Sequence, residues 1–470
     1  MAISLRTWPS RLVARPWLLA FAPINAATAG FGVVLPLLIL IPLHGSWADV
    51  AVAATLFNAS VILSSVVWGH LADRYRGRRA FLVLNYGGYA ALYLVLAHVV
   101  SLPLLYLLYT AIGLLAPAGA SASNLLILEK FPESERATAF ASFQEMSMIG
   151  SVAGLLIGYF WTVANDALLS LLYVLSALAG ASAVALWLGI REAHRPLTTA
   201  VVARHPESLV SRLRISTSLR IAIPFFPKRP TLSRAALGRF RRWAREEMHH
   251  ELPLVMAGMF LFNLASNLFN ISYTPYLYSI GLGVAAIFLV NFSNNFAQVL
   301  LFPLTGRLAN RLGSDALVRW STYIRSLGYL ATAGFTFVLF FHGDAFVANL
   351  LVFGILGGAI AVYTTASSLI LFRGLEGRDA GGLLGVNSSL GGAAAVLGAG
   401  LSGVLAVFGS YRLVFLVAAG ALLASVPIWA AAAVAYHRRK LGSAALAPRA
   451  ATAPSSSPGP ADVAASAKPH

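Results

Sequence analysis

The sequence lacks cysteine and is poor in charge. None of its 470 residues is cysteine, which excludes disulfide bonds and thiolate-bound metals. Only 11% of the residues are charged, whereas 58% are hydrophobic, and the mean hydropathy is +0.75. A water-soluble protein of this length could not bury so much apolar surface. The composition therefore indicates a polytopic membrane protein.

Sequence patterns of catalysis are also lacking. The chain has no serine–histidine–carboxylate set, no metal-ligand spacing and no glycine-rich phosphate loop, and its ten histidines are scattered. Pumping driven by ATP would need a nucleotide-binding domain, so that class is excluded. We predict no enzyme activity, no cofactor and no metal site.

Acidic residues are scarce relative to basic ones. The chain has 17 Asp and Glu against 34 Lys and Arg, a formal net charge of +17. A basic protein can bind nucleic acid, but here the basic residues fall between apolar runs. Cytoplasmic loops of membrane proteins carry such an excess, and anionic headgroups attract it. The charge therefore predicts the lipid bilayer as a partner, and not nucleic acid.

Long apolar runs are abundant. Because a membrane helix needs about 20 apolar residues, the sequence predicts twelve spans, near 16–43, 48–71, 80–100, 102–128, 137–163, 166–190, 251–279, 284–308, 316–341, 345–372, 380–407 and 411–436. An even number of spans places both ends of the chain on one side of the membrane.

The basic residues identify that side. Nearly all lysines and arginines lie in the two tails and in five loops, 73–79, 129–136, 191–250, 307–319 and 373–379. Short loops rich in Lys and Arg remain in the cytoplasm. We therefore expect a multi-pass protein of the plasma membrane with both termini cytoplasmic. Arg325 is an exception, about two turns into the ninth span.

One basic turn occurs twice. Residues 69–79 read GHLADRYRGRR, and residues 306–313 read GRLANRLG. The offset is 306 − 69 = 237 residues, about half of the chain. Asn58 and Asn295 differ by the same 237 residues, so we expect them at equivalent depths. The repeat predicts two copies of one membrane unit.

The first copy resembles the signature loop between the second and third helices of the major facilitator superfamily, roughly G-x-L-A-D-R-x-G-R-R. One residue is inserted here, so the glycine falls at Gly77. The resemblance implies an all-α polytopic membrane protein with twelve transmembrane helices in two pseudo-symmetric six-helix halves, related by an axis along the membrane normal. It also implies secondary transport of a small solute by alternating access.

Four regions follow from these boundaries. Residues 1–190 form the N-terminal half, 191–250 a cytoplasmic linker, 251–440 the C-terminal half and 441–470 a tail. Within the linker, residues 231–249 place apolar side chains at steps of three and four between arginines, which predicts an amphipathic basic helix on the membrane surface. A solvated charged linker is the alternative for the earlier part. The tail is rich in Ala, Pro and Ser and is expected to be disordered.

The resemblance implies a gate at the basic turn. In the superfamily, an acid in this loop helps to hold the two halves together when the transporter faces outward. A carboxylate is also favoured near a helix N-terminus by the helix dipole. Charge that only sets the topology is the alternative. The predicted gate set is Gly69, Asp73, Arg74, Gly77, Arg78, Glu129 and Arg136.

Polar residues at membrane depth indicate a solute cavity. They cost free energy in hydrocarbon, so they usually face the bundle interior or water. In the superfamily, helices one, four, seven and ten line the central cavity, with two, five, eight and eleven beside them. Hydrogen bonding between helices is the alternative. The predicted cavity set is Asn25, Asn58, Tyr109, Asn263, Asn267, Asn270, Tyr273, Asn291, Asn295 and Tyr363.

Glu145 is the candidate for proton coupling. It lies nine residues beyond Arg136, roughly 13 Å along the fifth span, near the bilayer centre. A carboxyl group at that depth favours its neutral form and can carry a proton. At 100° per residue it falls opposite Gly154, so it faces its own half if that glycine faces the other half. A structural, hydrogen-bonded acid is the alternative.

The uncharged cavity set suits a neutral or amphipathic organic solute. We expect proton-coupled transport, with export favoured because sugar-importer signatures are absent at residues 191–194 and 436–439. Drug–proton antiporters of the superfamily carry a proline in their glycine-rich motif, and no proline occurs from 137 to 163. A proton-linked nutrient importer and a transporter-like sensor or interaction protein are the alternatives. The protein is expected to be a monomer.

Overall fold

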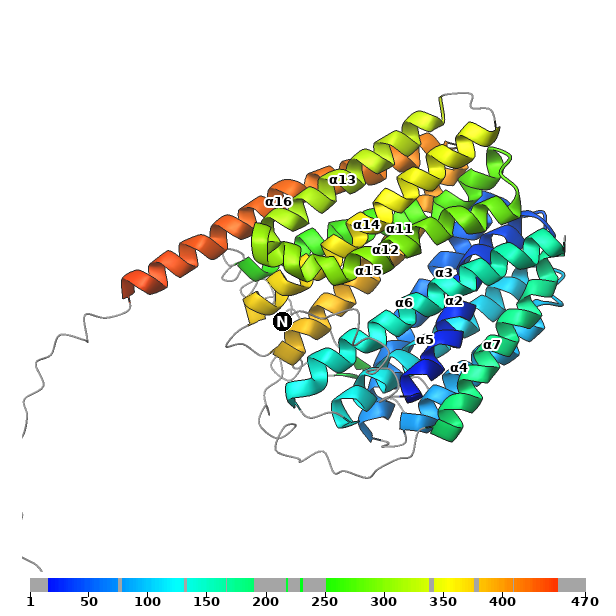
Figure 1. Cartoon of the computed structure of the whole chain (residues 1–470), viewed down its shortest axis with the longest axis horizontal. Coiled ribbons are helices and arrows are strands. Elements are labelled where there is room, and N and C mark those ends of the chain that lie inside the picture. The colour runs from blue at the N-terminus through cyan, green and yellow to red at the C-terminus, as the bar shows by residue number, and fades with distance from the viewer. Residues whose placement is uncertain are drawn as a thin grey trace, which may run out of the picture.

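The computed structural model of the protein is nearly all helical (Figure 1). It describes residues 16–74, 78–130, 133–165, 167–189, 217–218, 229–230, 251–337, 342–375, 380–408 and 410–446. The helices are η2 (Pro16–Ala20), α2 (Phe21–Leu40), α3 (Trp47–Arg74), α4 (Arg78–Leu96), α5 (Leu102–Lys130), α6 (Glu133–Ala164), α7 (Leu168–Gly189), α11 (Glu251–Ser279), α12 (Val284–Leu312), α13 (Ser314–Phe335), α14 (His342–Leu375), α15 (Ala380–Val407) and α16 (Tyr411–Leu446). Two short strands, β1 (Thr217–Ser218) and β2 (Arg229–Pro230), pair antiparallel in the linker.

The predicted all-α fold with twelve long helices is confirmed. Among the described residues, eleven helices are long and apolar enough to cross a membrane. The twelfth, α13, carries Asp315, Arg319 and Arg325, which lower its hydropathy. Helix α16 is longer than predicted: it continues to Leu446, ten residues beyond the predicted end at 436 (446 − 436 = 10). Helix therefore extends into the first residues of the expected tail, and the rest of the tail lies outside the described residues.

The helices form two bundles with the same internal pairing (Figure 1). In the first, α2 packs against α6 and α7, α5 packs against α3 and α4, and α4 packs against α7. In the second, α11 packs against α15 and α16, α14 packs against α12 and α13, and α13 packs against α16. Each pairing of the first bundle thus recurs in the second between helices of the same rank. This is the arrangement expected of two copies of one unit.

Glycine lets the helices within each bundle approach closely. A Cβ atom at Gly150 or Gly154 of α6 would collide with the backbone of Ala22 or Ala26 of α2. In the second bundle, a Cβ atom at Gly398 of α15 would lie 2.7 Å from the carbonyl oxygen of Leu264 on α11. Small residues permit such backbone contact between membrane helices.

The start of α3 shows why the chain turns there. Ser46 precedes the helix, and its backbone N–H and hydroxyl both donate to one carboxylate oxygen of Asp49, each at 2.7 Å. The pair resembles a capping box, which satisfies donors that a helix start leaves unpaired. The other carboxylate oxygen accepts a hydrogen bond from the Tyr106 hydroxyl, also at 2.7 Å. Asp49 therefore ties the start of α3 to α5.

The two bundles meet through α3 with α15, α6 with α12 and α2 with α11. We call the end where residues 41–46 join α2 to α3 the far end, and the end where α2 begins and α16 finishes the terminal end. Near the far end, the Trp47 indole stacks on the Tyr411 ring at 4.1 Å. A Cβ atom at Gly158 would collide there with the Phe288 ring. These contacts hold the far ends of the two bundles together.

Candidate functional site

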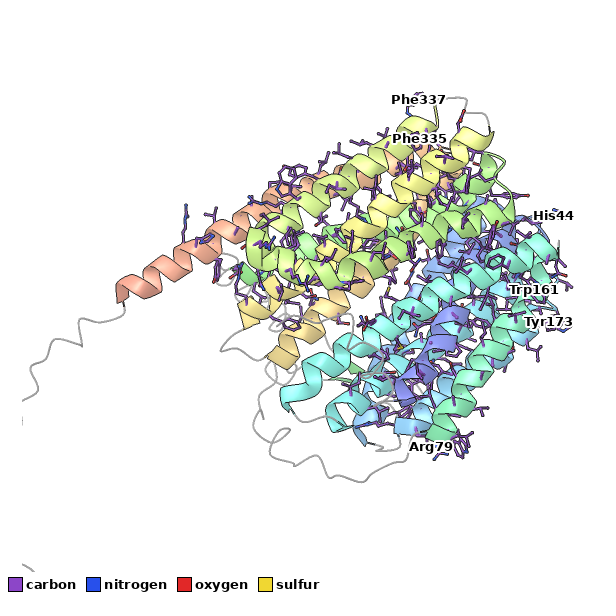
Figure 2. All side chains as sticks on the ribbon, viewed as in Figure 1. His44, Arg79, Trp161, Tyr173, Phe335 and Phe337 are labelled. Atoms are coloured by element: carbon purple, nitrogen blue, oxygen red, sulfur yellow. The ribbon has the colours of Figure 1, made fainter. Side chains whose placement is uncertain are left out.

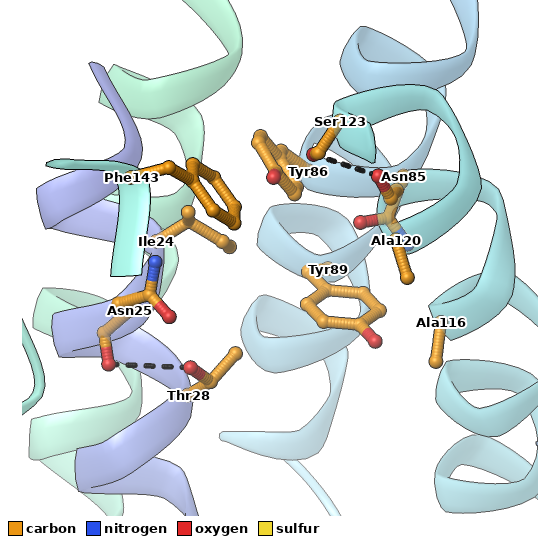
Figure 3. A pocket seen from close by; sticks show the side chains of 11 residues that line it. Ile24, Asn25, Thr28, Asn85, Tyr86, Tyr89, Ala116, Ala120, Ser123 and Phe143 are labelled. Atoms are coloured by element: carbon orange, nitrogen blue, oxygen red, sulfur yellow. Dashed lines mark hydrogen bonds between the residues drawn. The ribbon is translucent and has the colours of Figure 1, made fainter. Parts of the chain in front are cut away.

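A cavity of about 240 Å³ lies inside the first bundle, between α2, α4, α5 and α6 (Figure 3). Its walls are amide, hydroxyl, aromatic and small apolar groups, and none of the lining residues is charged. The lining residues are Ile24, Asn25, Thr28, Asn85, Tyr86, Tyr89, Ala116, Gly119, Ala120, Ser123 and Phe143.

Helix α4 supplies the polar and aromatic wall of this cavity. Asn85 is 2% exposed, and its side-chain N–H donates to the carbonyl oxygen of Leu115 on α5 at 2.6 Å. Gly119 accommodates this amide, because a Cβ atom there would collide with it. Tyr86 and Tyr89 are 7% exposed and place their rings beside it. Sequence reasoning missed this wall, although an amide and two tyrosines one turn apart were a usable signal.

Helix α2 supplies the opposite wall. The Asn25 side-chain N–H donates to the Phe21 carbonyl oxygen at 2.8 Å and to the Ser147 hydroxyl of α6 at 3.3 Å. The Thr28 hydroxyl donates to the Asn25 carbonyl oxygen at 3.2 Å. Figure 3 shows Asn25 and Thr28 across the cavity from Asn85. Asn25 is thus a predicted cavity residue that lines this cavity.

This arrangement can bind an uncharged ring. An enclosed apolar cavity of about 150 Å³ is known to hold benzene, so about 240 Å³ admits a somewhat larger ring system. Aromatic side chains such as Tyr86, Tyr89 and Phe143 offer faces for stacking. Asn25 and Thr28 offer polar groups that can fix its orientation.

Three asparagines of the predicted cavity set lie on α3 and α12, which flank the interface between the two bundles. Each donates its side-chain N–H to the carbonyl oxygen four residues earlier in its own helix. For Asn58 this is Ala54, at 2.9 Å, and for Asn295 it is Asn291, at 3.1 Å. Asn291 repeats the pattern to Ile287 at 2.9 Å. Asn58 and Asn295 therefore make the same local hydrogen bond in helices of the same rank, and their role in a cavity stays a prediction.

The asparagines of α11 lie partly beside α15. A Cβ atom at Gly398 of α15 would lie 2.9 Å from the Cβ of Asn267, and one at Gly391 would lie 3.8 Å from the Asn263 amide nitrogen. Asn267 donates to the Asn263 carbonyl oxygen at 2.9 Å. Asn270, one turn on, is exposed. Of the three side chains, that of Asn270 is the most exposed.

The predicted tyrosines pack against other rings. Tyr109 stacks on Phe57 of α3 at 4.6 Å. Tyr273 is 1% exposed, and its hydroxyl donates to the Asn349 side-chain oxygen at 3.2 Å. Tyr363 is 4% exposed and stacks on Phe262 at 3.3 Å. These contacts give the three rings a packing role, and a role in binding solute stays a prediction.

The predicted gate lies at the terminal end, and the structure describes only part of it. Gly69 lies in the last turns of α3, where a Cβ atom would meet nothing within 4 Å. Arg78 begins α4 and is 5% exposed. The structure describes the backbone alone for Asp73 and Arg74 at the end of α3, Glu129 near the end of α5 and Arg136 near the start of α6, while Gly77 lies outside the described residues. The gate stays a prediction.

Glu145 lies twelve residues after the first residue of α6 (145 − 133 = 12) and is half-buried. Two residues away on either side, Phe143 lines the cavity and Ser147 contacts Asn25. Glu145 was expected to face its own half if Gly154 faced the other half. Gly154 instead packs on α2 of its own bundle, so that condition is not met. A residue opposite Gly154 on α6 faces away from α2. Proton coupling by Glu145 stays a prediction.

An ion cluster at the terminal end of the second bundle escaped sequence reasoning. Arg373 of α14 donates to Glu251 of α11 at 2.7 and 3.1 Å, and to Asp315 of α13 at 2.9 and 3.0 Å. Its guanidinium carbon also lies 3.6 Å from the centroid of the Tyr436 ring on α16. The cluster joins the ends of α11, α13 and α14 to one another and to α16. The three charged residues are far apart in sequence, so only the fold brings them together.

Comparisons with known proteins agree with this architecture. The family model described as Major Facilitator Superfamily matches residues 17–370. No curated protein matches the sequence. Among solved structures, the nucleoside transporter NupG is 13% identical, with a TM-score of 0.61 over 89% of this chain and 98% of that chain. An auto-inhibited peptide transporter of the POT family is 16% identical, with a TM-score of 0.65 over 89% of this chain and 96% of that chain.

Proposed function

Because the chain belongs to the major facilitator superfamily, we propose that it is a secondary transporter and not an enzyme, and that it carries a small neutral or amphipathic organic solute by alternating access. The solute binds in the first bundle, beside the interface that α2 and α6 form with the second bundle, and it crosses the lipid bilayer as the two bundles tilt relative to each other. Both bundles carry the same pairing of helices, which supports motion as two rigid units.

The single observation that carries the choice of solute is the uncharged cavity of about 240 Å³ beside Asn25, Asn85 and Tyr89. A site without charged lining residues would leave a charged solute poorly compensated, because burying an unpaired charge costs free energy. Stacking on Tyr86 and Tyr89 favours a planar ring. The same groups suit a nucleoside-like or other heteroaromatic compound, and NupG is a nucleoside transporter of the same fold.

The stacking of Trp47 on Tyr411 supports a state that is closed at the far end. With the termini in the cytoplasm, as the loop charges predict, this is the state open to the inside. In the outward-facing state the basic turn at Asp73 and Arg74 closes the terminal end instead, with Glu129 or Arg136 as partners. The protein works as a monomer in the plasma membrane. Residues 1–190 and 251–440 are its two moving halves, and 191–250 link them.

Glu145 carries the coupling proton in this proposal. Its half-buried side chain lies on α6 opposite the glycine face that packs on α2, and a carboxyl group inside a membrane span can take up and release a proton as that face opens and closes to water. Exchange of an inward-moving proton for an outward-moving solute gives export. In the importer alternative, the proton and the solute move inward together.

A thermal-shift screen of purified protein against uncharged heteroaromatic compounds tests the proposal. A ligand that binds the native state raises the unfolding temperature. We expect at least one compound to raise the unfolding temperature. The same compound should also be transported in counterflow experiments with proteoliposomes. Tyr89→Phe, which removes one hydroxyl from the cavity, should weaken that ligand severalfold. Tyr173→Phe on the exposed face of α7 is the matched control (Figure 2). A ligand whose affinity is unchanged in Tyr89→Phe and in Thr28→Val would place the solute elsewhere.

A further inference from the structure

Arg325 is the largest fully buried side chain in the described part of the protein, with 1% of its surface exposed. It lies eleven residues after the first residue of α13 (325 − 314 = 11), about 16 Å along the helix. That depth is close to the middle of a bilayer. A cation buried there is costly unless a negative group is paired with it.

The partners of Arg325 leave its charge uncompensated. Its Nε–H donates to the Tyr329 hydroxyl at 2.8 Å, and its guanidinium carbon lies 4.9 Å from the Phe262 ring centroid. Its Nη1 is buried and has no hydrogen-bond partner among the described residues. No carboxylate in the described part of the chain forms an ion pair with it. The contacts found are with neutral groups.

Two further buried polar atoms without partners among the described residues belong to rings that adjoin Phe262 in turn. The Tyr363 ring stacks on Phe262, with 4° between the planes, and its hydroxyl is unpartnered. The Trp429 ring meets Tyr363 edge-on at 6.0 Å, and its Nε1 is unpartnered as well. Gly258, one turn before Phe262, leaves room for this indole, because a Cβ atom there would lie 2.6 Å from it. Helices α11, α13, α14 and α16 thus meet in one layer.

These unpartnered groups share one chemical property, which is that each can donate a hydrogen bond. The guanidinium and the indole can only donate, and the tyrosine hydroxyl can do so. Buried polar groups in native proteins are nearly always satisfied. The missing partner is therefore an acceptor, and the charge of Arg325 requires it to be negative. We propose that the second bundle binds a small monovalent anion beside Arg325, Tyr363 and Trp429, either an inorganic halide or the carboxylate of an organic acid.

This anion site is separate from the solute cavity. The cavity lies between helices of the first bundle, whereas Arg325 lies among helices of the second. A bound anion would neutralise the only arginine at mid-depth of α13 and hold α11, α14 and α16 around it. The site stands whatever solute the protein carries.

Thermal unfolding of the purified full chain at constant ionic strength tests the proposal. Chloride, bromide or formate replaces gluconate, a carboxylate too bulky for an enclosed site. We expect a saturable rise of about 2 °C or more in the unfolding temperature. Response to chloride and bromide assigns the site to halide, and response to formate alone assigns it to a carboxylate. No saturable response to any of the three overturns the proposal.

Variants connect the response to the site. Arg325→Met removes the charge at similar length, so it should abolish the response and unfold at a higher temperature than wild type in gluconate. Tyr363→Phe keeps the ring stack and should weaken the apparent anion affinity about threefold or more. Arg412→Met, at an exposed arginine of the far end, is the control and should respond as wild type does. A wild-type response in Arg325→Met overturns the proposal. If that variant does not fold, unchanged affinity in Tyr363→Phe does so.

Discussion

The Trp47 indole stacks on the Tyr411 ring with 21° between their planes, and it joins α3 of one bundle to α16 of the other. Tyr411 also meets Tyr276 of α11 edge-on at 5.9 Å. The contact therefore belongs to a small aromatic cluster that spans the interface at the far end. Alternating access requires this cluster to separate in the opposite state.

Trp47→Ala should open the far end more often. An aromatic pair contributes about 0.5–1.5 kcal/mol beyond its buried area, so its loss shifts the population up to roughly tenfold. The natural absence of cysteine allows a single Gly403→Cys reporter, which faces Ala51 across the interface. We expect its alkylation rate to rise about threefold or more in Trp47→Ala. Val407→Cys, on an exposed surface, should react equally in both backgrounds.

Asp73→Asn should leave the protein inserted and folded but slow transport. The change removes the charge by which the outward-facing state would hold its terminal end closed. Initial rates of solute counterflow per folded molecule measure the effect, and we expect a reduction of about fivefold or more. Asp344→Asn, at an exposed acid of α14, is the matched control. Normal rates in Asp73→Asn would leave the basic turn with a topological role alone.

Asn270→Ala should weaken solute binding far more than it lowers stability. Asn270 is exposed and on the same helix face as Asn267 and Asn263, so its truncation leaves no buried group unpaired. We expect a severalfold loss of affinity with an unfolding temperature within about 1 °C of wild type. Asn267→Ala should show the same imbalance less clearly, because its Cβ packs near Gly398. Parallel losses of affinity and stability would instead favour packing.

Glu145→Gln should uncouple transport from the proton gradient. The amide mimics the protonated carboxyl and cannot release a proton. Accumulation driven by a pH gradient in proteoliposomes should be abolished, whereas downhill exchange of solute should persist at a similar rate. Two results contradict this expectation, namely a variant that still concentrates solute against its gradient, and a wild type without any pH dependence.

Arg373→Met should destabilise the second bundle strongly. It leaves the Glu251 carboxylate, 2% exposed, without its cation, and breaking a buried pair in this way costs about 3–5 kcal/mol. Adding Glu251→Gln removes the stranded charge, so the double variant should unfold at a higher temperature than Arg373→Met alone. Additive losses in this double-mutant cycle would mean that the two side chains do not interact.

The fold was predictable because the sequence of one membrane unit is repeated in the chain. The 237-residue offset linked the two basic turns, and Asn58 and Asn295 now make the same hydrogen bond in matching helices. Apolar length alone located each helix, since a bilayer imposes a minimum span. The glycines of α6 indicated close packing, but their spacing could not say which neighbour they meet. The structure identifies α2.

The site was less predictable, because its contacts join distant parts of the chain. Asn25 was found from its depth, whereas Asn85 on α4 was not, although the two face the same cavity. The hydrogen bond of Asn85 to α5 depends on Gly119, which no local pattern connects with it. Arg373 and Glu251 are 122 residues apart, and their pairing depends on how α11 and α14 pack. The sequence showed that Arg325 lies inside a span, but it could not show which side chains surround the guanidinium group.

The low hydropathy of α13 has a consequence for how the protein is made. An arginine at the centre of a nascent helix opposes its partition from the translocon into lipid by about 2.5–3.5 kcal/mol. Helices α14 and α16, which pack against α13 in the folded protein, are synthesised only after it. Helix α13 must therefore remain near the translocon, or at the lipid interface, until α14 arrives. Insertion of the second bundle is for this reason a joint step of several helices, not a sequence of independent ones.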